Sequence, residues 1–182
     1  MAKVVNSTFV SLDGVVNHMD KWHFDYLSDE SDQLAMRQLS AADALLMGRR
    51  SYEVYAGAWP GRDGEYPDRI NAMRKYVAST TLTDPEWNNT QVLSGDLVES
   101  VARLKDEHSG DILMHGYGPV AQAMIRAGLL DELHLWYHPV LAGVGGPDDV
   151  LLTEGLHAVF RTTGAEVFDN GIVVMSMVKR DD

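Results

Sequence analysis

The sequence predicts an α/β fold: a three-layer α/β/α sandwich with a mixed, mostly parallel sheet that is closed by a C-terminal antiparallel hairpin. Three observations support this prediction. Apolar runs typical of strands alternate with segments of helical spacing along most of the chain. The stretch 111–141 has the pattern of a strand, a glycine turn, a helix and a second strand. Near the end, Asp169-Asn170-Gly171 between two apolar stretches is the strongest hairpin signal in the chain.

The first half of the chain is expected to alternate between strands and helices. A β-branched and aromatic run that ends in a Ser-Leu-Asp-Gly turn indicates the first strand, and acidic residues at the start of the next segment indicate a helix. A short apolar run that leads directly into Gly48 indicates a second strand and helix. The expected elements are a strand at 4–10, a helix from 28 or 29 to 39, a strand at 44–47, a helix that follows Gly48 and ends near 57, a helix at 67–73 and a strand at 75–79.

The second half contains the clearest helix and strand signals. Pro119 suits a first helical position, Gly128 lies where a left-handed cap would fall, and the apolar residues after it alternate as in a strand. The expected elements are strands at 90–93, 112–115, 132–138, 161–168 and 171–179, with helices at 97–108 and from 119 to about 127.

The composition narrows the class of protein. The 182 residues favour one domain, 1–182, and the chain has neither an apolar run long enough for a membrane span nor an N-terminal signal peptide, so we expect a cytoplasmic protein. Cysteine is absent, which removes disulfides and thiolate metal sites. With 27 acidic and 15 basic residues the formal net charge is −12, which argues against nucleic-acid binding. Any anionic ligand must therefore be held locally.

Two strand-to-helix junctions contain glycine, Met47–Ser51 and His115–Pro119. A helix that begins after glycine presents free backbone N–H groups and the positive end of its dipole, which together suit a phosphate. Arg49 and Arg50 add two guanidinium groups, although solvated surface arginines are the alternative. Each junction alone is as well explained by an ordinary turn, but as a pair they suggest a dinucleotide. Because Ala121 replaces the third glycine of G-x-G-x-x-G, a plain Rossmann fold is disfavoured.

The motifs SLDGVV, a loop tryptophan, LLMGRRSYE, KYVASTTL and DILMHGYGPVAQAMIRAGLLDELHLWYHPVLAGVG follow one another in this order. The combination resembles the dihydrofolate-reductase-like superfamily, and most of all its riboflavin-biosynthesis branch, the reductase or RibD C-terminal domain of bifunctional deaminase-reductases and its stand-alone members. The resemblance covers about residues 3–178. It implies an NADPH-dependent reductase of dihydrofolate-reductase-like fold.

The resemblance also implies which residues bind the cofactor. Residues 48–51 would contact the phosphates and the adenosine ribose, 79–81 the 2′-phosphate, and 116–119 the pyrophosphate, while 13–15 would border the nicotinamide and the substrate. The expected cofactor-binding residues are Gly14, Val15, Met47, Gly48, Arg49, Arg50, Ser51, Ser79, Thr80, Thr81, His115, Gly116, Tyr117, Gly118, Pro119 and Val120.

Catalytic and substrate-binding candidates are fewer. Asp13 ends the first strand and is the first choice for a proton donor or a substrate-orienting carboxylate, although an aspartate before glycine is equally ordinary in a turn. An aromatic wall for a flat heterocycle could be formed by Trp22, Tyr52, Tyr55 and Trp59, with plain packing as the alternative. No metal site is expected, since His134 and His138 would lie roughly 13 Å apart on a strand.

We therefore expect a reductase that transfers hydride from NADPH to a small heterocyclic or imine-containing metabolite. The substrate would be a small molecule, for example 5-amino-6-(5-phosphoribosylamino)uracil of riboflavin biosynthesis. Two alternatives remain open: a dihydrofolate or pterin reductase, and a non-catalytic nucleotide-binding protein. An outward-facing Trp136 on the strand 132–138 would suit a homodimer face.

Overall fold

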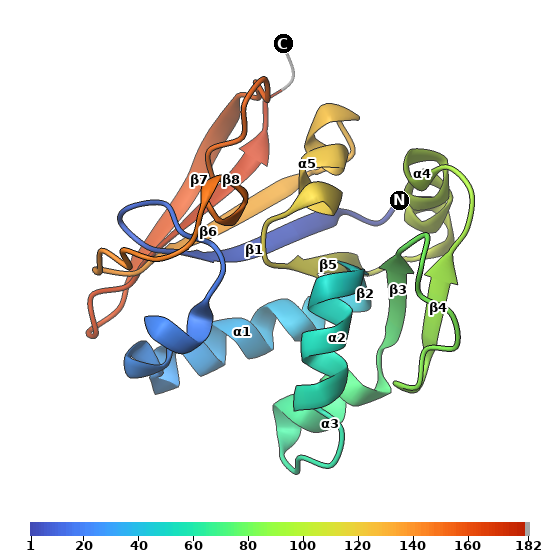
Figure 1. Cartoon of the computed structure of the whole chain (residues 1–182), viewed down its shortest axis with the longest axis horizontal. Coiled ribbons are helices and arrows are strands. Elements are labelled where there is room, and N and C mark those ends of the chain that lie inside the picture. Colours follow the sequence, from blue (N-terminus) through green and yellow to red (C-terminus); the bar gives the residue numbers. More distant parts are fainter. Residues whose placement is uncertain (181–182) are drawn as a thin grey trace.

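The structure is a computed structural model that describes residues 1–180. Its centre is a mixed sheet of strands β1 (Val4–Val10), β2 (Ala42–Gly48), β3 (Arg74–Ala78), β4 (Thr90–Leu93), β5 (Asp111–His115), β6 (Glu132–Tyr137), β7 (Phe160–Val167) and β8 (Val173–Lys179). The strands lie in the order β4-β3-β2-β5-β1-β6-β8-β7 (Figure 1). β1 to β6 pair in parallel, whereas β8 runs antiparallel to β6 and β7 antiparallel to β8.

Helices connect the parallel strands, except for β3 and β4, which a loop joins. They are α1 (Asp29–Ala41), α2 (Arg49–Ala58), α3 (Glu65–Ala72), α4 (Leu97–Glu107) and α5 (Pro119–Arg126), with short 3-10 turns η1 (Met19–Lys21), η2 (Phe24–Tyr26) and η3 (Pro147–Asp149). All five expected helices are present. The first begins with a capping interaction, because the Ser28 hydroxyl accepts from the backbone N–H of Ser31 at 3.3 Å. Across the described chain, the helices are all too short or too polar to span a bilayer.

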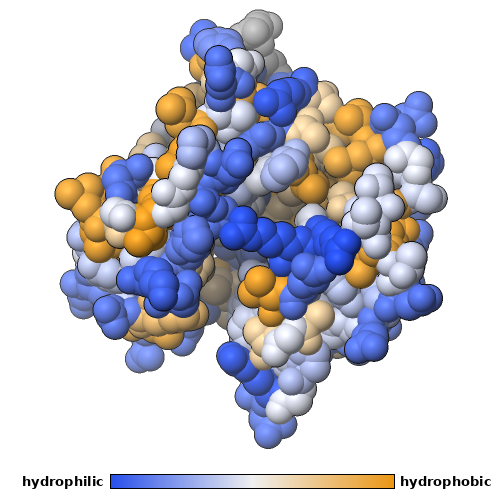
Figure 2. Space-filling model, in the orientation of Figure 1, coloured by the Kyte–Doolittle hydropathy of each residue, from blue (hydrophilic) through white to orange (hydrophobic). Residues whose placement is uncertain are grey.

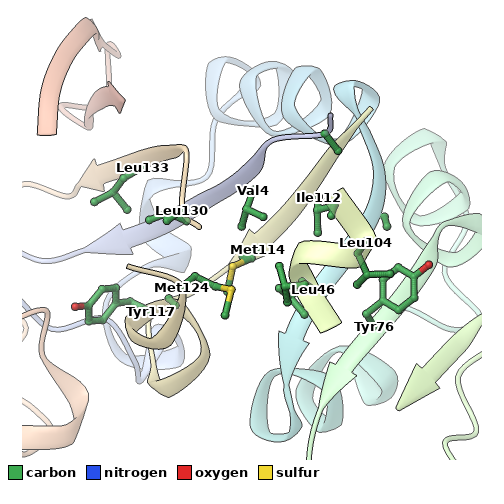
Figure 3. Packing of buried hydrophobic residues seen from close by; sticks show 14 of the residues in the cluster. Val4, Leu46, Tyr76, Leu104, Ile112, Met114, Tyr117, Met124, Leu130 and Leu133 are labelled. Carbon is green, nitrogen blue, oxygen red and sulfur yellow. The ribbon is translucent and has the colours of Figure 1, made fainter. Parts of the chain in front are cut away.

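The sheet separates two hydrophobic clusters. Successive strand residues point to opposite faces. Val5 accordingly belongs to a cluster with buried side chains of α1, α2 and α3, Tyr52 among them. Val4 packs on the other face with Leu104 of α4 and Met124 of α5 (Figure 3). The helices therefore cover both faces. The predicted three-layer sandwich with a mixed sheet is confirmed.

The C-terminal hairpin is also confirmed. Residues 169–171 form the turn between β7 and β8, and Gly171 has φ +90°, a conformation that favours glycine. One expectation about the neighbouring strand is wrong. β6 lies between β1 and β8, and Trp136 is only 1% exposed, with its indole N–H donated to the Ser7 hydroxyl at 2.9 Å. Trp136 therefore offers no outward face to a second subunit.

Candidate active site

The two glycine junctions open onto one cleft of about 1280 Å³ at the carboxyl ends of β2 and β5. Residues 47–51 of the first junction and 115–120 of the second line it together. β2 and β5 are neighbours in the sheet, so α2 and α5 both begin at this edge (Figure 1). The face that carries them is hollowed near its middle and bordered by hydrophilic residues (Figure 2). The expected convergence of the two junctions is thus present in the geometry.

The junctions approach each other closely because of glycine. A Cβ at Gly48 would lie 3.3 Å from Cγ2 of Val120, tighter than most carbon contacts. Gly116 has φ +76°, and its carbonyl accepts from the side-chain amide of Asn6 at 2.8 Å, which fixes the turn. No heavy atom beyond the adjoining residues lies within 4 Å of a Cβ built at Gly116 or Gly118, so the space above both is open. Backbone N–H groups at the start of α5 can therefore face a ligand.

A second cavity of about 420 Å³ continues the cleft beyond Arg49. The two cavities share Arg49, Ala78, Pro119 and Val120 in their linings. Residues 79–81 line the second cavity, and the Arg49 guanidinium donates to the Thr81 hydroxyl at 2.6 Å and to Glu53 at 2.6 Å. This end of the site thus combines a guanidinium with hydroxyl groups, a combination suited to a phosphate.

The outer wall of the cleft is formed by the segment 147–154, which we call the strap and most of whose residues line the cavity. Its backbone is tied to the loop after β1: the Leu151 N–H donates to Gly14 O at 2.7 Å and the Val16 N–H to Asp149 O at 2.8 Å. The Asp149 carboxylate also accepts from the Asn17 side-chain amide at 2.9 Å. Neither the strap nor Asn17 was among the residues expected to form the site, since the strap has no periodic pattern of its own and follows a glycine-rich loop.

Asp13 does not line either cavity. Its carboxylate accepts from the Ser11 hydroxyl at 2.5 Å and from the backbone N–H groups of Ala142 and Gly143 at 2.9 and 2.8 Å. These hydrogen bonds, led by that of Ser11, lower the pKa of Asp13 to about 2, so it carries no proton to donate near neutral pH. The geometry therefore favours the turn-forming alternative: Asp13 anchors the segment that leads into the strap.

The four aromatic residues expected to form a substrate wall do not line the cleft either. Trp22 is 4% exposed and packs edge-on against His138, and Tyr52 is also 4% exposed, with its hydroxyl accepting from the Trp87 N–H at 3.1 Å. Trp59 packs in the cluster of α2 and α3. Two of the four reach a cleft residue: the ring centroid of Tyr55 lies 5.8 Å from that of His115, and the Trp22 indole N–H donates to the carbonyl of Asn17 at 2.9 Å. Plain packing thus accounts for most of this set.

His115 stands at the end of β5, where the sheet meets the cleft. Burial lowers the pKa of its imidazole to about 4, so the ring is neutral at pH 7. Its Nδ1 atom is buried and makes no hydrogen bond. A neutral ring at this position can donate one hydrogen bond to a bound molecule and accept one from it without adding charge to the site.

Similarity to known proteins extends over nearly the whole chain. Residues 2–174 match the family model of the RibD C-terminal domain. The uncharacterized protein YyaP of Bacillus subtilis (strain 168) is 23% identical over 176 residues, which cover 94% of this chain and 92% of that protein. The name of this relative assigns no activity, so the likeness supports nothing finer than common ancestry.

Solved structures share the fold. A protein of Shewanella sp. PV-4, provisionally described as a riboflavin biosynthesis protein, has a TM-score of 0.78 at 21% identity, with 100% of both chains covered. A diaminohydroxyphosphoribosylaminopyrimidine deaminase/5-amino-6-(5-phosphoribosylamino)uracil reductase from Thermotoga maritima has a TM-score of 0.67 at 16% identity, with 98% of this chain and 57% of that one covered. The fold is therefore dihydrofolate-reductase-like. Because the family model spans nearly the whole sequence, the chain belongs to the RibD C-terminal domain family.

Proposed function

We propose that the protein is an NADPH-dependent reductase that transfers hydride to a small heterocyclic or imine-containing metabolite. The observation that carries this proposal is the shared cleft: the junctions 48–51 and 116–119 border one cavity, which continues into the pocket of Arg49 and Thr81. A dinucleotide needs one site for a diphosphate and another for its adenosine end, and the two cavities would supply both. Family membership supports the reductase chemistry.

The residues present fit such a cofactor. Backbone N–H groups at the starts of α2 and α5 would bind the diphosphate, with the helix dipoles adding positive potential. The Arg49 guanidinium and the Thr81 hydroxyl, 2.6 Å apart, would bind the 2′-phosphate. The cofactor would supply the hydride. The chain would align donor and acceptor and exclude water, with the strap covering the outer side.

Fluorescence titration with NADPH and NADH tests the cofactor assignment. Arg49→Ala should weaken NADPH by roughly 10- to 100-fold and leave NADH within about twofold, because a hydrogen bond to a charged group contributes about 1.5–3 kcal/mol. Arg37→Ala is the matched control, since Arg37 pairs with Glu166 on the exposed side of α1. Equal loss of both cofactors would contradict the role given to Arg49. Failure of the unaltered protein to bind either one would remove the reductase proposal.

Turnover separates the proposal from its alternatives. NADPH oxidation is followed by absorbance with 5-amino-6-(5-phosphoribosylamino)uracil and with dihydrofolate. Oxidation with the first compound alone would favour the riboflavin type of reductase, and oxidation with the second a folate reductase. Cofactor binding without turnover on any heterocycle would favour a nucleotide-binding protein.

A further inference from the structure

Two buried side-chain atoms beside the cleft lack hydrogen-bond partners: Nε2 of Gln38 and Nδ1 of His115. Within residues 1–180 the one other such atom is Oγ1 of Thr90, on the edge strand β4. An unpaired buried polar atom costs about 1–3 kcal/mol. Two such atoms in one cluster indicate a site at which a bound ligand supplies the missing hydrogen bonds.

The two unpaired atoms belong to one cluster. Ser7 of β1 and His115 of β5 are register partners, so their side chains leave neighbouring strands on the same face of the sheet. The Ser7 hydroxyl donates to Oε1 of Gln38 at 2.8 Å, which brings the side-chain amide from α1 to this point. The cluster therefore joins the floor of the cleft to α1.

The Gln38 amide meets Ser7 with its oxygen. The indole N–H of Trp136 donates to the Ser7 hydroxyl at 2.9 Å, so Ser7 has its own proton left for one acceptor. That acceptor is Oε1 of Gln38, and the Nε2 group, with both of its protons, is turned away from Ser7. The cluster thus offers a free amide donor that suits a carbonyl oxygen.

The surrounding charge disfavours a phosphate at this cluster. Arg37, the basic residue next to Gln38 on α1, pairs with Glu166 at 3.2 Å. The strap adds the cleft-lining carboxylates of Asp148 and Glu154, and the whole chain has a net charge of −12. The arginines that line the cleft are those at the start of α2, at the cofactor end. The one basic side chain of α1 is thus already paired, so a substrate phosphate near Gln38 would receive no counter-charge from this helix.

Resting on the proposed function, we propose that Ser7, Gln38 and His115 form a subsite for an uncharged, amide-containing heterocycle that carries no phosphate. The Gln38 amide donates to a ring carbonyl, and the neutral His115 ring pairs with a second polar atom. Both unpaired atoms are covered in the free protein. Binding therefore turns a covering side chain aside, and Tyr55 is the aromatic neighbour in contact with His115.

The experiment compares two probes that differ only in a phosphate: 5-amino-6-ribitylaminouracil and its 5′-phosphate. Each is titrated calorimetrically into the protein saturated with NADP⁺. We expect the uncharged probe to bind more tightly, and Gln38→Met to weaken it by roughly tenfold, the value for one hydrogen bond of about 1.4 kcal/mol. NADPH binding should stay within about twofold. Arg37→Gln, one position away and exposed, is the control.

A measurement on the unaltered protein tests the subsite even if the Gln38→Met variant misfolds. In the unaltered protein, the side-chain NH₂ resonances of Gln38 should shift on addition of the uncharged probe in a ¹⁵N-correlated NMR spectrum. The subsite is refuted if neither probe binds, if the phosphate form binds tenfold more tightly, or if these resonances do not move. Such a result leaves NADPH binding intact and so differs from failure of the proposed function, in which the cofactor itself does not bind.

Discussion

A buried histidine pair should make the stability of the protein depend on pH. Nδ1 of His23 lies 3.0 Å from Nε2 of His138, whose Nδ1 lies 2.9 Å from the Trp136 carbonyl. His138 therefore donates to this carbonyl and accepts from His23, which requires the His138 ring to be neutral. Phe9 stacks on His23 at 4.1 Å between ring centroids. Burial lowers the pKa of both rings and so disfavours a positive charge on either one.

The lowered pKa of His23 sets the size and the sign of this dependence of stability on pH. Burial, followed by repulsion from His138, lowers the pKa of His23 from 6.5 to about 4. Because the unfolded chain binds the proton more readily, this contribution to stability is fully present above pH 6.5 and is lost as the pH falls toward 4. Between pH 7 and pH 5 the loss is about 2 kcal/mol, from 1.36 kcal/mol per pKa unit.

Urea denaturation at pH 7 and pH 5 measures the loss of unfolding free energy in the unaltered protein and in the His23→Phe variant. The variant keeps an aromatic ring beside Phe9 but cannot be protonated, so its fall in unfolding free energy should be smaller by about 2 kcal/mol. Burial of His115, whose pKa is also lowered to about 4, acts in the same window and cancels in the comparison. His157→Gln, at an exposed histidine, is the control. An equal fall in all three proteins would refute the reasoning.

Three further predictions concern single residues. Lys75→Met should lower the unfolding free energy by about 2–4 kcal/mol in urea, because the buried ammonium donates to three backbone carbonyls at 2.7–3.1 Å. Asp13→Ala should speed hydrogen exchange at the amides of Ala142 and Gly143, and Asp13→Asn should retain turnover, which a proton donor would not. Gly116→Ala should cost about 1–2 kcal/mol in thermal unfolding, because φ is +76° there.

The parts of the fold that the sequence predicts correctly depend on neighbours in the chain. Pro119 at the start of α5, Gly128 with φ +68° after its end and the Asp169–Gly171 turn each act over a few residues, and all are present in the structure. Alternating apolar residues likewise predict β6. The convergence of the two glycine junctions could be expected because parallel strands carry their carboxyl ends to one edge of a sheet.

The errors concern contacts between distant segments. Asp13 meets the N–H groups of residues 142 and 143, about 130 positions later in the chain, and nothing next to Asp13 indicates this partner. The polar surroundings of Trp22 in the sequence indicate a loop, but its ring is buried against His138. Gln38 carries no signal in the sequence, because a glutamine on a helix is usually solvated and its contact with Ser7 depends on how α1 crosses the sheet.

The adjacent arginines at the start of α2 illustrate why sequence spacing cannot assign roles within a motif. Successive residues of a helix point about 100° apart. The Arg49 guanidinium accordingly reaches Thr81 beyond β3, whereas that of Arg50 extends toward Asp149 of the strap, 3.7 Å away. The position of β3 beside β2 brings the hydroxyl within reach of Arg49. Sheet order, which no local pattern encodes, therefore decides which arginine faces the hydroxyl groups of the second cavity and which one faces the strap.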